Sequence, residues 1–145
     1  MGIGFIDRWR ARHGHHPGRP APDAEGDQAS MAELLSDCEL LREFAERAGL
    51  RLDDEVPSLS ALDQLLPSWR DDPATAGWLG NDAGYYLGTV VVRTVPGARW
   101  QLAADGSPLV ELSDGRQLDV AAVGHSWART GTPQLTAAYL ETTDH

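Results

Sequence analysis

One apolar stretch decides the fold: WLGNDAGYYLGTVVVRTV, at residues 78–95. Valine and tyrosine are frequent in its second half, which favours a strand at residues 86–95. Two rows with a period of four instead indicate a helix, because residues four apart share one helix face. The rows are Gly80, Gly84 and Gly88, and Leu79, Ala83, Leu87, Val91 and Val95. We predict a helix over about residues 75–94 and keep the strand as the alternative.

The glycine row predicts how this helix packs. Glycines spaced by four let another backbone approach closely, and in a long apolar helix they indicate dimerisation in a membrane. Here Asn81, Asp82 and Arg93 interrupt the apolar run, which is too short to span a bilayer. We therefore expect the glycine face to pack within a soluble core.

Two turn signals predict a small sheet after this helix. Asp105-Gly106 and Asp114-Gly115 are typical of tight hairpin turns. Apolar residues alternate before, between and after the turns, as Trp100 and Leu102, Val110 and Leu112, and Leu118 and Val120. This pattern predicts a three-stranded antiparallel meander with one buried face. Two short helices should follow it, one capped by Asp119 and one by Thr132-Pro133.

Helices are predicted on the N-terminal side as well. Ser30 and Glu33 form a capping box that opens one helix ending at Gly49. Cys38 lies on the buried stripe of this helix, so we interpret it as a core residue. A second helix begins at Pro57-Ser58 and is kinked or ended by Pro67. Asp72-Pro73 indicates a further helix start.

Together these elements predict an α+β fold, with the N-terminal helices packed on the meander and short helices at the C-terminus. The 145 residues are about enough for one domain. We assign residues 30–145 to it. Residues 1–29 form a basic and aromatic arm and a linker rich in proline, glycine and histidine.

The charge is unevenly distributed along the chain. Overall, 12 basic residues, all arginine, face 22 acidic residues, giving a net charge of −10. Residues 1–22 hold four arginines and one acidic residue, whereas residues 23–145 hold eight arginines and 21 acidic residues. The acidic body argues against nucleic-acid binding. The single cysteine excludes an intramolecular disulfide framework.

The arm contains the first group of candidate partner-binding residues. Phe5, Ile6 and Trp9 would share one face of a helical turn, with Arg8 and Arg12 beside or opposite it. This pattern is typical of a helix that docks on a partner protein or on an anionic membrane surface. The alternative is that the arm folds back onto its own acidic body.

The linker contains a histidine cluster that is a weak candidate for a metal site. His13, His15 and His16 carry imidazole nitrogens that bind divalent metals. Neighbouring prolines and glycines give these rings no fixed geometry, so we expect a solvated tract. The sequence implies no cofactor.

Recognisable catalytic patterns are absent from the sequence. It has no lysine-bearing phosphate loop, no Gly-x-Ser-x-Gly elbow and no His-Glu-x-x-His. The second group of partner-binding candidates is Trp78, Asn81, Asp82 and Tyr85, where aromatic and polar residues lie next to glycines. The alternative is that Trp78 anchors the core while Asn81 and Asp82 face water or bind nearby backbone amides.

A family resemblance rests on two motifs, Leu-Gly-x-x-x-Gly-x-Tyr-Leu-Gly at residues 79–88 and Val-Pro-Gly-Ala-Arg-Trp at residues 95–100. With the meander that follows, they resemble an uncharacterised actinobacterial family of small α+β domains of unknown function, over about residues 57–141. The resemblance implies a fold and transfers no catalytic residue.

We therefore expect a non-enzymatic, cytoplasmic protein-interaction module. The alternative is a peripheral membrane protein that binds through the arm, and the second alternative is an enzyme with a site near residues 78–93. No small-molecule substrate can be identified, and no nucleic-acid partner is expected.

Overall fold

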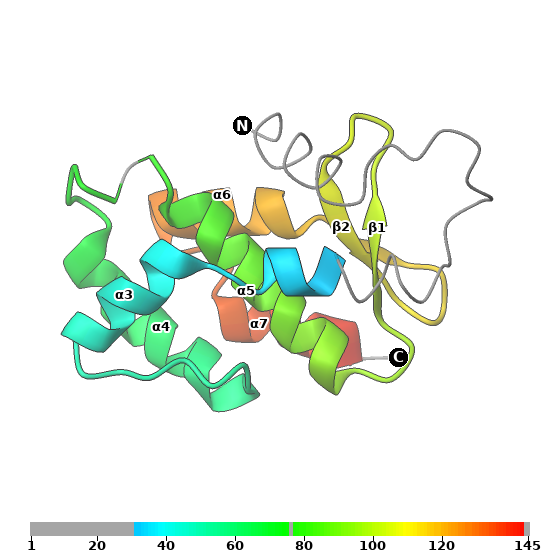
Figure 1. The fold of residues 1–145 in the computed structure, drawn as a ribbon, viewed down its shortest axis with the longest axis horizontal. Coiled ribbons are helices and arrows are strands. Elements are labelled where there is room, and N and C mark those ends of the chain that lie inside the picture. Colours follow the sequence, from blue (N-terminus) through cyan, green and yellow to red (C-terminus); the bar gives the residue numbers. More distant parts are fainter. Residues whose placement is uncertain (1–30, 76, 144–145) are drawn as a thin grey trace.

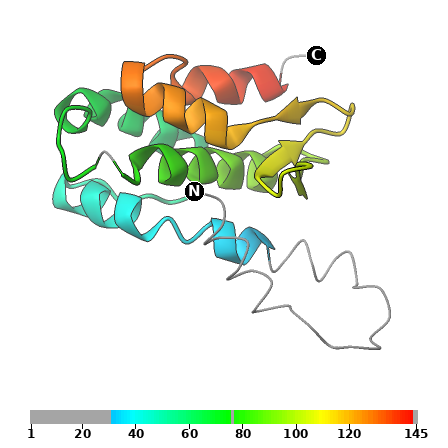
Figure 2. The ribbon, with the colours of Figure 1, turned by 90° about the horizontal axis from the view of Figure 1, so that it is seen from above.

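The computed structural model describes residues 31–75 and 77–143. Residues 31–35 are helical and are followed by the labelled elements α3 (Glu39–Arg47), α4 (Val56–Trp69), α5 (Leu79–Thr94), β1 (Arg99–Leu102), β2 (Pro108–Glu111), β3 (Gln117–Leu118), α6 (Val120–Thr130) and α7 (Leu135–Thr143). α5 runs through the middle of the molecule, and the sheet lies at one end (Figure 1). Figure 2 shows α3 on one side of α5, with α6 and α7 on the other. The predicted α+β fold is confirmed.

α5 is a helix, so the alternative of a strand at residues 86–95 is wrong. Gly80 and Gly84 of its glycine row pack as predicted against a second backbone, that of α6, whereas Gly88 packs against the ring of Trp100 on β1. A Cβ added to Gly84 would lie 2.2 Å from the carbonyl oxygen of Val120, and one added to Gly124 would lie 2.1 Å from that of Gly80. Larger side chains at these positions would therefore separate the two helices.

The sheet is the predicted meander, with the order β1-β2-β3 and antiparallel pairing throughout. Trp100 pairs with Val110, which in turn pairs with Leu118. Trp100 and Val110 are buried, and the sheet packs against α5 and α6. Asp119 caps α6 as predicted, because its Oδ1 accepts a hydrogen bond from Ala122 N at 3.1 Å.

The single helix predicted from Ser30 to Gly49 is wrong. Helical structure stops after residue 35, and α3 begins at Glu39. Between them Cys38 has left-handed backbone angles, with φ 41°. The end of α3 agrees with the prediction: Gly49 has φ 83°, and Leu50 N donates to Ala45 O at 2.8 Å. Ser30 itself lies outside the described residues.

Two predictions about helix ends also need correction. Asp72-Pro73 does not begin a helix, since Asp72 Oδ1 instead accepts from Ala74 N at 2.9 Å within a turn. α7 is capped by Asp63 of α4, whose carboxylate accepts from Leu135 N at 2.8 Å, rather than by Thr132-Pro133. α4 continues for two residues beyond Pro67 and ends at Trp69.

Within the part of the chain that the structure describes, no helix combines the length and apolar character needed to cross a bilayer. The arm and linker predicted at residues 1–29, with their candidates Phe5, Ile6, Arg8, Trp9, Arg12, His13, His15 and His16, lie outside that part.

Candidate functional site

The structure divides the second group of candidates into two pairs. Trp78 packs edge-on against Phe44, with ring centroids 5.0 Å apart, and its Nε1 donates to Ala74 O at 2.8 Å. Asn81 Oδ1 lies 2.8 Å from His125 Nε2. Trp78 and Asn81 therefore make contacts within the fold.

Asp82 and Tyr85 line a surface groove between α5 and the break that precedes α3. We call it the α3–α5 groove. Its volume is about 210 Å³. The side chains around its mouth are Leu34, Asp37, Glu39, Leu40, Asp82 and Tyr85, and the buried residues Leu35 and Cys38 complete its lining.

Asp82 positions the two sides of this groove relative to each other. Its Oδ2 accepts a hydrogen bond at 3.1 Å from the backbone N–H of Leu41, in the first turn of α3. A carboxylate at this place satisfies a helix N–H that has no partner inside the helix. The thiol of Cys38 adds a second link, donating to Leu35 O at 3.3 Å and to Asp82 O at 3.5 Å.

The rim of the groove is acidic. Burial raises the pKa of Asp82 above its ordinary value, the hydrogen bond from Leu41 N lowers it, and the nearby charges of Asp37 and Glu39 raise it further. Asp37 and Glu39 are exposed, and neither carboxylate forms an ion pair within the described residues. No described lining residue is basic, so none of them compensates the negative charge of the rim.

Arg42, the basic residue next to this region, is held by the backbone. Its guanidinium donates to Ser36 O at 2.8 Å, Asp37 O at 3.1 Å and Leu52 O at 3.2 Å. It also forms an ion pair with Asp54 at 2.7 Å. Arg42 thus satisfies carbonyl groups at the break before α3, and its ion-pair partner is Asp54.

The groove also presents apolar surface. Leu40 is 42% exposed, and Leu34 is half-buried beside it. Within the described residues only Leu102 and Leu140 are comparably exposed among the large hydrophobic side chains. Leu40 is the one of these three that lines the groove.

Cys38 is a core residue, as predicted. It is 6% exposed. Burial and the negative charge of Asp82 raise the pKa of its thiol far above the ordinary value. Because the thiolate is the nucleophile, the arrangement disfavours covalent chemistry at Cys38.

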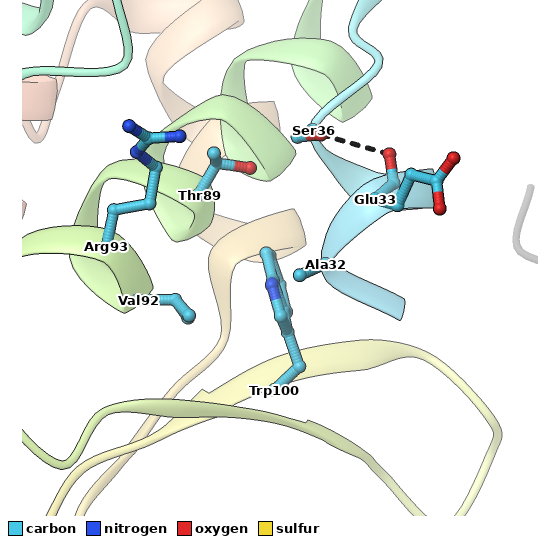
Figure 3. A pocket seen from close by; sticks show the side chains of 7 residues that line it. All are labelled: Ala32, Glu33, Ser36, Thr89, Val92, Arg93 and Trp100. Carbon is cyan, nitrogen blue, oxygen red and sulfur yellow. Dashed lines mark hydrogen bonds between the residues drawn. The ribbon is translucent and has the colours of Figure 1, made fainter. Parts of the chain in front are cut away.

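A second cavity, of about 260 Å³, lies between residues 32–36, α5 and β1. Figure 3 shows the Trp100 ring rising from β1 into it. Three of its polar side chains have partners within the fold: Ser36 Oγ donates to Glu33 O at 3.0 Å, Thr89 Oγ1 donates to Tyr85 O at 2.9 Å, and Arg93 lies 3.6 Å from Asp54. Ser36, Thr89 and Arg93 are therefore engaged in contacts within the fold.

The residues named for an active site near residues 78–93 do not line the same cavity among those described here. Asp82 lines the α3–α5 groove, Arg93 lines the cavity of Figure 3, and Asn81 lines neither. Within the described residues no group of three or more histidine, cysteine, aspartate or glutamate side chains could hold a metal ion.

The sequence pointed to Asp82 and Tyr85 but missed Asp37, Glu39 and Leu40. A single helix over residues 30–49 places Glu39 on a solvated face, away from any groove. One feature of the sequence could have indicated the groove. Leu40 is apolar but lies outside the apolar stripe of the predicted single helix.

No curated protein and no solved structure matches the chain. A family model matches residues 1–145. The match therefore includes the whole of residues 57–141, over which the sequence resembles a family of unknown function. Its description is a family of unknown function (DUF6278). On this match the chain belongs to the DUF6278 family of unknown function.

Proposed function

We propose that this protein is a non-enzymatic interaction module that binds a basic and apolar segment of a partner protein in the α3–α5 groove. The proposal rests on one observation: exposed Leu40 lines the groove together with the acidic residues Asp37 and Glu39. Neither carboxylate has an ion-pair partner among the described residues. A cytoplasmic location in an actinobacterium belongs to the same proposal.

The size of the groove supports a peptide side chain as its occupant. Small-molecule sites usually have volumes of about 300–1,000 Å³, and the groove measures about 210 Å³. A space of this size suits one or two apolar side chains of a longer segment. The rest of that segment would lie across the exposed rim.

Charge complementarity specifies the partner further. Asp37 and Glu39 face solvent at the rim, and none of the described residues that line the groove is basic. Arginine or lysine next to an apolar anchor would pair with these carboxylates. Such rim charges increase association rates and specificity more than they increase affinity.

A selection from a displayed library of short peptides on the full-length protein tests this proposal. We expect the enriched peptides to combine arginine or lysine with a bulky apolar residue. Selection on an Asp37→Asn/Glu39→Gln double variant should lose that basic preference. Glu46→Gln, an exposed acidic position on α3 outside the groove, is the control and should retain it.

Two results would refute the proposal. One is enrichment of peptides without basic residues on the wild-type protein. The other is an unchanged selection on the double variant, with the melting temperature showing that the variant is folded.

Membrane attachment through Phe5, Ile6, Trp9 and the nearby arginines stays a prediction, because the arm lies outside the described residues. Flotation with anionic vesicles at low salt distinguishes this alternative, since the attraction to such a surface weakens as salt is added.

A further inference from the structure

A third cavity lies at the start of α5, and its lining differs in charge from that of the α3–α5 groove. Its volume is about 400 Å³, within the usual range for small-molecule sites. Its basic side chains are Arg70, His125 and Arg129, and its acidic lining residue is Asp71. The excess of cationic groups stands out in a protein with a net charge of −10.

Three elements bring these groups together. Arg70 immediately follows α4, while His125 and Arg129 lie on α6. Leu79 and Gly80, the first two residues of α5, line the same cavity. A Cβ at Gly80 would lie 2.7 Å from His125 Nδ1, so glycine is what allows the histidine to lie this close to α5.

Neither arginine is used by the fold for an ion pair. Within the described residues, Arg42, Arg47, Arg93, Arg99 and Arg116 lie within ion-pair distance of a carboxylate. Arg70 and Arg129 form no such pair, although Asp71 lines the same cavity. Both guanidinium groups are exposed and keep their donors for a ligand.

The start of α5 lines this cavity and has one acidic residue, Asp82, in its first turn. Its N-cap residue Trp78 provides no side-chain cap, whereas α3, α6 and α7 each receive a carboxylate from Asp82, Asp119 or Asp63. The N-terminal end of a helix favours negative charge. His125 Nε2 donates to the amide oxygen of Asn81 at 2.8 Å, which fixes the ring at the cavity wall.

We propose that this cavity binds the phosphate group of a small phosphorylated compound. Arginine is the residue best suited to the task, because its planar set of donors matches phosphate oxygens in two-point contacts. Arg70 supplies these donors from the end of α4, and Arg129 supplies them from α6. This site is independent of the peptide groove.

Calorimetric titration of the full-length protein with inorganic phosphate and with glucose 6-phosphate tests the proposal. We expect saturable binding of at least one, weakened about tenfold by Arg70→Gln or Arg129→Gln, since each removes hydrogen bonds to a charged group. Asp71→Asn should strengthen binding, because it removes a negative charge from the cavity. Arg51→Gln is the control, an exposed arginine outside the cavity, and should leave affinity unchanged.

Vesicles containing phosphatidic acid, compared with neutral vesicles, distinguish the source of the phosphate. Binding of phosphatidic acid alone, lost in Arg70→Gln and Arg129→Gln, keeps the phosphate site and assigns it to a lipid headgroup. The proposal is overturned if none of the three probes binds saturably. It is equally overturned if Arg51→Gln weakens binding as much as the cavity variants do, with melting temperatures confirming that all are folded.

Discussion

Asp63, midway along α4, accepts a hydrogen bond at 2.8 Å from the backbone N–H of Leu135, the first residue of α7. The same carboxylate accepts from Thr136 N at 3.2 Å and from Trp127 Nε1 at 2.9 Å, and it is bonded to the Thr136 hydroxyl. One half-buried side chain thus joins α4, α6 and α7.

Replacing Asp63 by alanine should destabilise the protein strongly. The change leaves an indole N–H and two helix N–H groups without their acceptor, and we expect the free energy of unfolding to fall by about 2–4 kcal/mol. Chemical denaturation measures it. Gln64→Ala, at the adjacent exposed position, is the control and should change stability little; equal effects of the two substitutions would contradict the account.

The contact between α5 and α6 should not tolerate a methyl group. In Gly124→Ala the new Cβ would meet Gly80 O and the backbone of Gly84, and in Gly84→Ala it would meet Val120 O. We expect each variant to lose about 1–3 kcal/mol or more, as in other overpacked cores, or to fail to fold. Gly77→Ala, with nothing within 4 Å of its Cβ, should be neutral. If Gly124→Ala had the same free energy of unfolding as the wild type, α5 and α6 would have to lie farther apart than described.

The thiol of Cys38 should be inert in the folded protein. It is buried, and its pKa is raised by that burial, so little thiolate is present or accessible at neutral pH. An aromatic disulfide reagent should label it only as fast as the protein opens, and denaturant should make labelling rapid. Because the chain has one cysteine, the signal is unambiguous. Rapid stoichiometric labelling without denaturant would contradict the description of the groove lining.

The pKa of Asp82 predicts a specific dependence of stability on pH. Burial raises it above 3.8 in the folded state, so the folded protein holds this proton more tightly than the unfolded chain. Ionisation of Asp82 therefore lowers the free energy of unfolding as the pH rises from about 4 through the raised pKa. Asp82→Asn keeps an acceptor for Leu41 N and removes the titration.

The measurement is the difference in unfolding free energy, wild type minus Asp82→Asn, across acidic pH. We expect this difference to fall as the pH rises and then to become constant. A difference that rises with pH would mean that the hydrogen bond from Leu41 N outweighs burial.

Local patterns predicted the elements that depend on local chemistry. The period of four in Gly80, Gly84 and Gly88 identified both α5 and its close packing, because spacing alone places those residues on one face. The turns at Asp105-Gly106 and Asp114-Gly115 likewise fixed the meander. Both predictions required only residues that are close together in the sequence.

The break before α3 could not be predicted because distant residues hold it. Cys38 adopts left-handed angles while Asp82, on α5, caps the new helix and Arg42 binds the carbonyls of Ser36 and Asp37. A capping box and an apolar stripe describe only local preferences, which favour one continuous helix. The groove residues Asp37, Glu39 and Leu40 were missed for the same reason.

The central proposal is that the α3–α5 groove binds a basic and apolar segment of a partner protein. Its most direct test is the affinity of a selected basic peptide for matched variants. Leu40→Ser should weaken binding about tenfold, since it removes apolar contact area. Asp37→Asn and Glu39→Gln should each weaken it about two- to fivefold, as expected for exposed charges.

The controls are Leu140→Ser, at an exposed leucine on α7, and Glu46→Gln, at an exposed acidic residue outside the groove. The account predicts wild-type affinity for both controls, and weaker binding of the peptide to all three groove variants. Equal affinity of wild type and Leu40→Ser, or equal losses in Leu140→Ser and Leu40→Ser, would contradict it.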